Sequence, residues 1–226
     1  MAKVGAFLLA AGCVLHAGSP AYAAEAGGDL SSTKAGWGTL KGSVTLGHPP
    51  ATPSSADDLR NSVIYLEHVE SGSEARTAPL LPARMTQEGA RLHPRVLPIV
   101  KGRSVEFANR DQLSHDVVPL PKSAAFDLGR PGKNGSKTLK FETPGIVKLI
   151  CRIHSDMSGV IVVLDNPFYA QPGDDGRFVI DGIPPGQYRV VVWQERARLA
   201  AKPVRIEPGK ASILNFALSL TGQSGG

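Results

Sequence analysis

Short apolar segments, separated by glycine, proline and charged residues, follow one another along most of the chain and predict strands rather than helices. Apolar and polar positions alternate in part through residues 39–46, and Val105 and Phe107 fall on one face of residues 104–108. A period of two is that of a strand with one face on a core, and no long stretch keeps the period of an amphipathic helix. Residues 159–164 are apolar almost without interruption, which is typical of a buried strand.

Two short turns indicate how neighbouring strands pair. A Lys-Gly turn separates residues 95–100 from residues 104–108, and a Thr-Pro-Gly turn separates residues 137–142 from residues 146–151. Both patterns predict hairpins, in which each strand pairs with the next one along the chain. Together the segments predict an all-β sandwich assembly. Further strands are expected at residues 61–67, 177–180, 188–193, 204–206 and 213–218.

Composition agrees with this fold class and narrows the range of functions. Hydrophobic residues make up 42% of the 226 residues, so a core can form, and 25 glycines and 18 prolines suit a chain of short strands and turns. The formal net charge of +5 is mild, and the basic residues are scattered among few aromatic ones, so we expect no nucleic-acid partner. No segment beyond the N-terminal region is long and apolar enough to predict a transmembrane helix.

The N-terminal region has the features of a secretory signal peptide. Lys3 precedes the apolar residues 4–15, and the small-x-small sequence Ala21-Tyr22-Ala23 follows as a cleavage site. We therefore expect residues 1–24 to be removed and the mature protein to be exported to the periplasm. The alternative is a lipid anchor, because Ala10-Ala11-Gly12-Cys13 forms a weak lipobox that would leave Cys13 lipidated.

Removal of that peptide would leave Cys151 as the one cysteine of the mature chain. An exported protein with one thiol cannot form an internal disulfide, and the thiol is prone to oxidation unless it is buried or bound to a metal. A single cysteine is most often a small buried hydrophobic residue. The residues near Cys151 favour a role as a metal ligand instead.

Cys151, His154 and Met157 lie in one short segment with the spacing Cys-x2-His-x2-Met. A thiolate, an imidazole and a thioether are three of the four ligands of a blue copper centre, in which two imidazoles and one thiolate surround the metal and the thioether is a weak axial ligand. The fourth ligand should be a histidine from a distant strand. His115 is the candidate, because it lies just beyond the end of the predicted strand 104–108. For Met157 the alternative interpretation is core packing, since a buried methionine also fills cores.

Asn109-Arg110, with His115 six residues after the asparagine and the Cys151 loop further on, resembles the cupredoxins of the amicyanin type over roughly residues 91–165. The resemblance implies a Greek-key β-sandwich. It also implies that Asn109 ties the two ligand-bearing loops together and that its backbone N–H bonds the thiolate. This loop departs from the family pattern, because Ile153 and Ser155 stand where prolines are frequent.

The chain as a whole resembles exported bacterial proteins that are described as methylamine-utilisation-like, in which a cupredoxin is combined with a small carboxypeptidase-regulatory-like β-sandwich. The resemblance rests on Met85-x-Gln87, His93-Pro94, Gly186-x-Tyr188 and Trp193, besides the copper motifs. It suggests that the small sandwich is split by the inserted cupredoxin. The predicted parts are a signal peptide (1–24), a flexible leader (25–37), an N-terminal β segment (38–84), a cupredoxin domain (85–165), a carboxypeptidase-regulatory-like β unit (166–221) and a flexible tail (222–226).

The expected function is one-electron transfer in the periplasm between redox partners such as a cytochrome or a dehydrogenase. Two alternatives stay open: a copper carrier or buffer, and a structural exported protein with a vestigial site. We expect no enzyme, because the chain has one type 1 ligand set and no His-x-His pair for a trinuclear copper centre. We expect the remaining polar residues near these motifs to be solvent-exposed: His48, His68, His93, Asp111 and Asp156.

Overall fold

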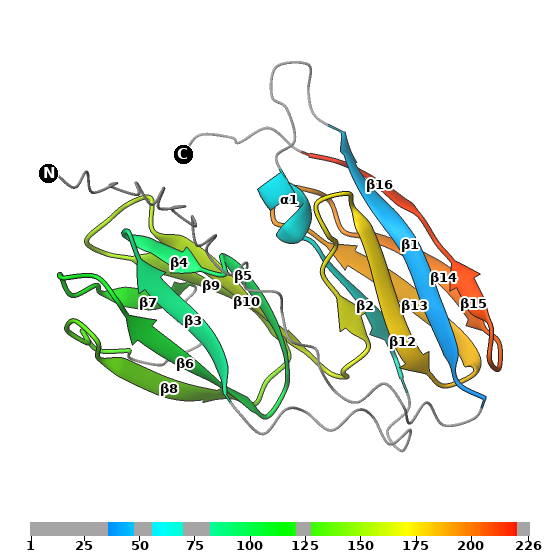
Figure 1. The fold of residues 1–226 in the computed structure, drawn as a ribbon, viewed down its shortest axis with the longest axis horizontal. Helices are drawn as coiled ribbons and strands as arrows, with labels where there is room; N and C mark the ends of the chain where they lie inside the picture. Colours follow the sequence, from blue (N-terminus) through cyan, green and yellow to red (C-terminus); the bar gives the residue numbers. More distant parts are fainter. Residues whose placement is uncertain (1–35, 48–55, 70–81, 121–127, 221–226) are drawn as a thin grey trace, which may run out of the picture. The chain divides into compact units, whose positions relative to one another are not determined.

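The computed structural model describes residues 36–47, 56–69, 82–120 and 128–220 (Figure 1). The predicted signal peptide, Cys13, His48, the tail 222–226 and nearly all of the leader lie outside the described residues. Among the described residues, no helix is both long enough and apolar enough to cross a membrane.

The described chain consists of strands and one short helix, so the prediction of an all-β fold is confirmed. The helix α1 (Ala56–Arg60) has five residues and was not predicted. The strands in chain order are β1 (Gly38–Gly47), β2 (Val63–Glu67), β3 (Ala83–Glu88), β4 (Arg91–His93), β5 (Val96–Val100), β6 (Arg103–Asn109), β7 (Val117–Leu120), β8 (Ser136–Phe141), β9 (Gly145–Cys151), β10 (Ser158–Leu164), β11 (Tyr169–Ala170), β12 (Arg177–Ile183), β13 (Gly186–Trp193), β14 (Ala200–Ile206), β15 (Ala211–Ile213) and β16 (Phe216–Ser219).

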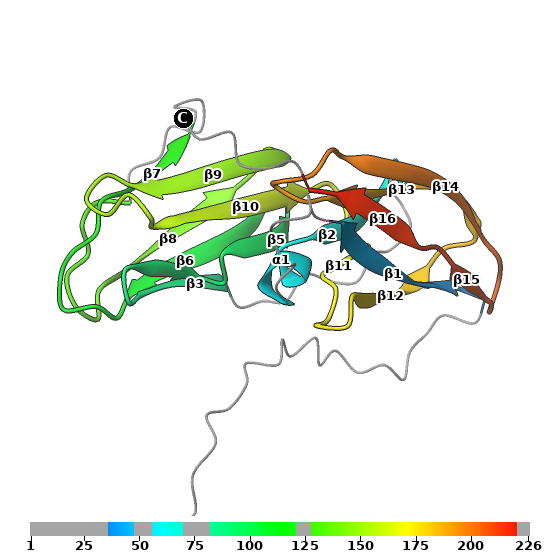
Figure 2. The ribbon, with the colours of Figure 1, turned by 90° about the horizontal axis from the view of Figure 1, so that it is seen from above.

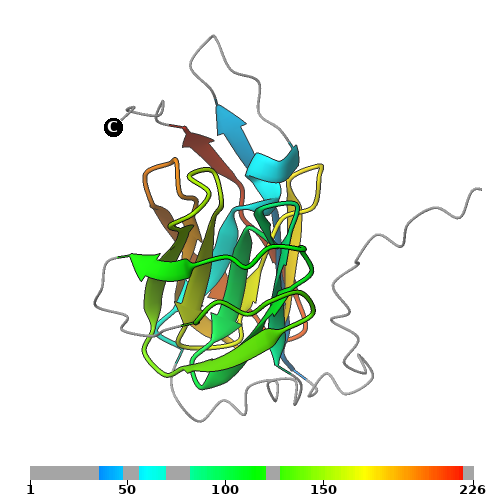
Figure 3. The same cartoon turned by 90° about the vertical axis from the view of Figure 1, so that its left-hand side faces the viewer.

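The middle of the chain forms a sandwich of two four-stranded sheets, with the strand orders β4-β3-β6-β8 and β5-β10-β9-β7. The two sheets lie face to face, as Figures 2 and 3 show. Alternate residues of each strand point into the space between them, so that Met85, Phe107, Leu149 and Ile161 are fully buried in one apolar cluster. Cys151 and Met157 belong to the same cluster.

Both predicted hairpins are wrong. The strand β5 pairs in parallel with β10, whereas β6 pairs with β3 and β8, so the Lys-Gly turn carries the chain from one sheet to the other. Likewise β8 pairs with β6, while β9 pairs with β10 and β7. Short turns of this kind can join two layers of a sandwich as well as two neighbours in a sheet, and the inward-facing apolar residues look alike in both cases.

The segments on either side of this sandwich pair with each other. In one sheet β1 lies between β12 and β15, and β16 also pairs with β1; the other sheet has the order β11-β2-β13-β14. Leu40 of β1 is opposite Ile180, and Ile64 of β2 is opposite Val192. These side chains, together with Phe168, are buried in a second apolar cluster. Strands before β3 and after β10 therefore make one sandwich (Figure 1).

The strand β10 is apolar throughout because both of its faces are buried. Ile161 and Val163 point into the first cluster, whereas Val160, Val162 and Leu164 belong to a third cluster. The prediction of a buried strand at residues 159–164 agrees with this arrangement. β10 leads directly away from the predicted ligand loop, so one end of that loop is held by the most deeply buried strand of the sandwich.

Candidate metal centre

The predicted ligand loop joins the end of β9 to the start of β10. Cys151 is the last residue of β9, and its backbone N–H donates to the carbonyl of Met157 at 2.9 Å. The N–H of Met157 in turn donates to the carbonyl of His154 at 3.1 Å. These bonds close the loop at its base, where Cys151 is 5% and Met157 0% exposed. His154, near the tip, is partly exposed.

His115 reaches the same place from the segment between β6 and β7, and its side chain is 2% exposed. Its Nε2 lies 2.7 Å from Oδ2 of Asp111. A carboxylate only accepts hydrogen bonds, so we assign the ring proton to Nε2, which leaves Nδ1 as an unprotonated donor for a metal. That Nδ1 lies 3.3 Å from Nδ1 of His154. Asp111 therefore selects the tautomer of His115 that a metal needs.

Asp111 is itself held by the turn between β3 and β4. Its Oδ1 accepts the N–H of Gly89 at 2.7 Å, and its Oδ2 accepts the N–H of Ala90 at 3.0 Å. Partial desolvation pushes the pKa of Asp111 upward, but the N–H groups of Ala90 and Gly89, with the ring of His115, bring the pKa below its usual value. The prediction that Asp111 is solvated is wrong: its side chain is 19% exposed and ordered by three donors.

Three ligand atoms converge closely enough to share one metal ion. One ligand atom each from His115, Cys151 and His154 lies within 4.8 Å of the other two, and Cys151 Sγ is 4.0 Å from His154 Nδ1. Two nitrogen ligands about 2.0–2.1 Å from one ion are about 3.3–3.6 Å apart at angles of about 109–120°, and a sulfur ligand about 2.3 Å away is about 3.8 Å from each nitrogen. The observed separations of 3.3 and 4.0 Å are close to these values, and the third separation lies within 4.8 Å.

Asn109 joins its own loop to the segment before β8 and does not join the two ligand-bearing loops. Its backbone N–H donates to the carbonyl of Gly135 at 2.9 Å, so the bond to the thiolate that the cupredoxin resemblance implied does not form. Its side-chain amide donates to the carbonyls of Leu113 and Pro131 at 2.9 and 2.8 Å, and Oδ1 accepts the N–H of Asp111. Asn109 is fully buried and fixes the path of the chain toward His115.

Asp116, which sequence reasoning did not single out, connects the two ligand-bearing loops. It follows His115 directly, and its backbone carbonyl accepts the N–H of Arg152, the residue after Cys151, at 3.0 Å. Its carboxylate lies 2.9 Å from the guanidinium of Arg130 and 3.7 Å from that of Arg152. The bridging role expected of Asn109 thus belongs to the residue beside the histidine. Adjacency to a ligand was the signal that could have identified it.

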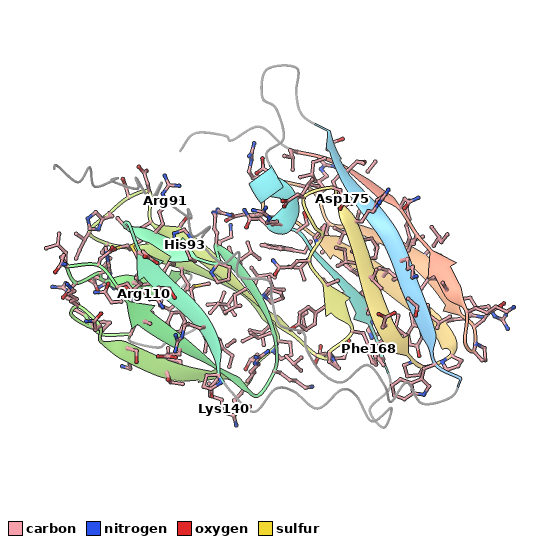
Figure 4. The ribbon with its side chains drawn as sticks, in the orientation of Figure 1. Arg91, His93, Arg110, Lys140, Phe168 and Asp175 are labelled. Atoms are coloured by element: carbon pink, nitrogen blue, oxygen red, sulfur yellow. The ribbon has the colours of Figure 1, made fainter. Side chains whose placement is uncertain are left out.

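The residues around the loop tip agree in part with the predictions. The N–H of Ile153 lies 3.4 Å from Cys151 Sγ and is directed at it, as its retention in place of proline predicted. Asp156 is exposed, as expected. So is His93, which lies on β4 (Figure 4). Arg110, the residue after Asn109, marks the end of the sandwich that carries the site, and Lys140 lies at the opposite end (Figure 4).

Comparison with known proteins gives partial likenesses in structure. No model of a protein family matches the sequence, and no curated protein matches it. A Cu(I) form of an amicyanin variant is 18% identical, with 51% of this chain and 95% of that chain covered and a TM-score of 0.35. A purple cupredoxin from Nitrosopumilus maritimus is 21% identical, covering 36% and 99% of the two chains, with a TM-score of 0.33.

A copper-containing nitrite reductase from Thermus scotoductus is 26% identical, with 54% of this chain and 28% of that chain covered and a TM-score of 0.37. Amicyanin and other copper proteins are thus among the solved structures that the chain resembles in part.

Proposed function

We propose that the protein is a one-electron carrier with a mononuclear type 1 copper centre. His115, Cys151 and His154 would hold the metal, and Met157 would be a further, weak ligand. The observation that carries this proposal is the convergence of one buried thiol and two imidazole nitrogens from two separate loops. Copper in such a centre supplies one-electron chemistry by cycling between Cu(I) and Cu(II).

The donor set favours copper over zinc. Structural zinc sites use four cysteine or histidine ligands, and catalytic ones use three protein ligands and a water. Here three such ligands are followed by a methionine that is buried at the base of the same loop. A thioether is a soft, weak donor that suits Cu(I), whereas the imidazoles suit both oxidation states.

The surroundings suit a centre that changes little on electron transfer. Asp111 holds the ring of His115, the hydrogen bond between Cys151 and Met157 closes the loop, and Asp116 connects the two loops. Ligands held by their own hydrogen bonds keep one geometry whether or not the charge on the metal changes. The partly exposed ring of His154 is the natural route for the electron between the centre and a partner.

We propose that the protein works in the periplasm, because residues 1–24 have the pattern of a signal peptide. The partner would be another redox protein, a cytochrome or a dehydrogenase. We propose carriage of electrons rather than catalysis, because one ligand set of this type has no open position for a substrate.

The test separates an electron carrier from a copper carrier. The copper-loaded mature protein is reduced with ascorbate and reoxidised with ferricyanide through several cycles, in the presence of a chelator specific for Cu(I). An electron carrier exchanges one electron per protein in each cycle and keeps its copper. Transfer of copper to the chelator after the first reduction would favour a carrier or buffer, and failure to bind copper with thiolate coordination would favour a structural protein with a vestigial site.

A further inference from the structure

Gln87 is a polar side chain enclosed in the apolar core of the sandwich that carries the candidate centre. It is 1% exposed, and its Oε1 has no hydrogen-bond donor among the described residues. Burial of a carbonyl oxygen without a partner costs free energy, so most such atoms in proteins are paired, and an exception requires an explanation. Leucine or methionine would fill the same space without that cost.

The neighbours of Gln87 place it at the ligand end of the core. It is the last inward-facing residue of β3, after Ala83 and Met85. In the parallel pairing of β3 with β6 it is opposite Asn109, the last residue of β6 before the loop to His115. Two residues after Gln87, just beyond the end of β3, the N–H of Gly89 donates to the carboxylate that holds His115.

On its other side, Gln87 pairs with Leu92 of β4. Leu92 packs against Gly159, where an added Cβ would lie 2.9 Å from the Leu92 Cδ1 atom, and Gly159 follows Met157 by two residues. Leu92, Cys151 and Met157 belong to one buried cluster. Gln87 therefore lies on β3 between β6, which leads to His115, and Leu92, which contacts the strand that follows Met157.

We propose that the side-chain oxygen of Gln87 is a further, weak donor to the metal ion, in addition to the four predicted ligands. This inference rests on the proposed function. Amide oxygens already occur as weak axial donors in centres of this type. A metal would also give the buried oxygen the partner that the described protein residues do not provide.

The chemistry of the donor predicts its effect. Oxygen is a harder donor than the sulfur of Met157, and hard donors stabilise Cu(II) more than Cu(I). Loss of the Gln87 oxygen should therefore raise the reduction potential and shift the centre toward plain four-coordination. In the metal-free protein the same change removes an unpaired buried carbonyl, so it should not lower stability and should raise it where the new side chain fits.

The experiment compares Gln87→Leu with the wild type, each loaded with one equivalent of Cu(II). We expect a rise in potential of about 59 mV or more, which is a tenfold change in the ratio of the Cu(I) and Cu(II) affinities. The EPR spectrum should change its g values and copper hyperfine splitting at the same time. The copper-induced rise in Tm should be smaller in the variant than in the wild type.

Met85→Leu is the matched control, because Met85 is equally buried two residues earlier on the same face of β3 and has no oxygen. A shift in both variants would assign the effect to packing and overturn the inference. A Gln87→Leu variant with the same spectrum and reduction potential as the wild type would also overturn the inference. The partner of the Gln87 oxygen would then be a buried water molecule. If Gln87→Leu does not fold, Gln87→Ile gives the same comparison with a side chain that suits a strand and has no donor atom.

The wild-type sample separates this inference from the function on which it rests. A wild type without an intense thiolate-to-copper band contradicts the proposed function. A wild type with that band, beside a Gln87→Leu variant that differs in no respect, contradicts only the role of Gln87.

Discussion

Asp111→Asn tests the claim that one carboxylate prepares His115 for a metal. Asp111 accepts from three donors, the N–H groups of Gly89 and Ala90 and the Nε2–H of His115. Asparagine has the same shape but one acceptor oxygen instead of two. If the carbonyl takes the place of Oδ2, the bonds to Ala90 and His115 are kept, and the N–H of Gly89 faces an NH2 group.

The expected loss of stability follows from the number of hydrogen bonds that the substitution changes. A hydrogen bond to a charged group contributes about 1.5–3 kcal/mol, and Asp111→Asn removes one such bond and weakens two others by removing the charge. Because the Asp111 side chain is 19% exposed, water replaces part of the loss. We therefore expect the free energy of unfolding of the metal-free protein to fall by about 2 kcal/mol at neutral pH. Loss of a group that orients a ligand should also weaken copper binding by about 10–100-fold.

Urea unfolding of the metal-free protein measures the first quantity, and competition with a chelator of known affinity measures the second. Asp156→Asn is the matched control, because Asp156 lies exposed in the ligand loop and accepts a long, 3.5 Å hydrogen bond from the hydroxyl of Ser155. We expect the control to change stability by less than about 0.5 kcal/mol. Equal effects of the two substitutions, in stability and in copper affinity, would refute the role assigned to Asp111.

The same carboxylate predicts a pH dependence. Its folded-state pKa lies below the ordinary value of 3.8, so the stability it contributes is fully present above that value and is lost as the pH falls through the lower folded pKa. The difference in stability between wild type and Asp111→Asn should therefore shrink on acidification below about pH 4, measured in the metal-free protein. A difference that stays constant down to pH 2 would contradict this assignment.

Three further predictions concern the loop, the core and one close approach of the backbone. Ile153→Pro removes the N–H that lies 3.4 Å from Cys151 Sγ. Because that hydrogen bond draws charge from the sulfur, the reduction potential of the variant should fall. A redox titration that gives a higher potential than the wild type would contradict this interpretation. Leu149→Ala, at a fully buried position, should cost about 2–5 kcal/mol in urea unfolding, and a loss below about 1 kcal/mol would mean that the core is not packed as described. Gly42→Ala would place a Cβ 1.8 Å from the backbone carbonyl oxygen of Leu214, so it should lower stability by about 3 kcal/mol or more, whereas Gly47→Ala, with 3.7 Å to its nearest atom, should be tolerated.

The strands could be predicted from the sequence more readily than their partners. Alternation within residues 104–108 and the apolar run at 159–164 identify strands because side-chain direction is a local property. Partner choice is not local. The Lys-Gly turn after β5 carries the chain to the opposite sheet, and the contact that fixes it, from the N–H of Lys101 to the carbonyl of Leu164, joins residues far apart in sequence.

The proposed ligands were identified because their spacing is short and their chemistry is unusual. The residues that position these ligands could not be identified from the sequence, because Asp111 and Asp116 look like ordinary loop carboxylates there. Their roles depend on partners that the fold brings beside them. These partners are the β3–β4 turn for Asp111, and Arg130 and Arg152 for Asp116. Asn109 was given a role by resemblance, and the chain assigns that role to Asp116 because the loop places the carbonyl of Asp116 opposite the N–H of Arg152.

The most direct test of the central claim is the pair of visible and EPR spectra of the mature protein after addition of one equivalent of Cu(II), with Cys151→Ala beside it. A type 1 centre predicts an intense blue thiolate-to-copper band and a narrow copper hyperfine splitting in the wild type, and the loss of both in the variant. A pale wild-type sample with ordinary copper EPR, or a blue band that survives in Cys151→Ala, would contradict the account.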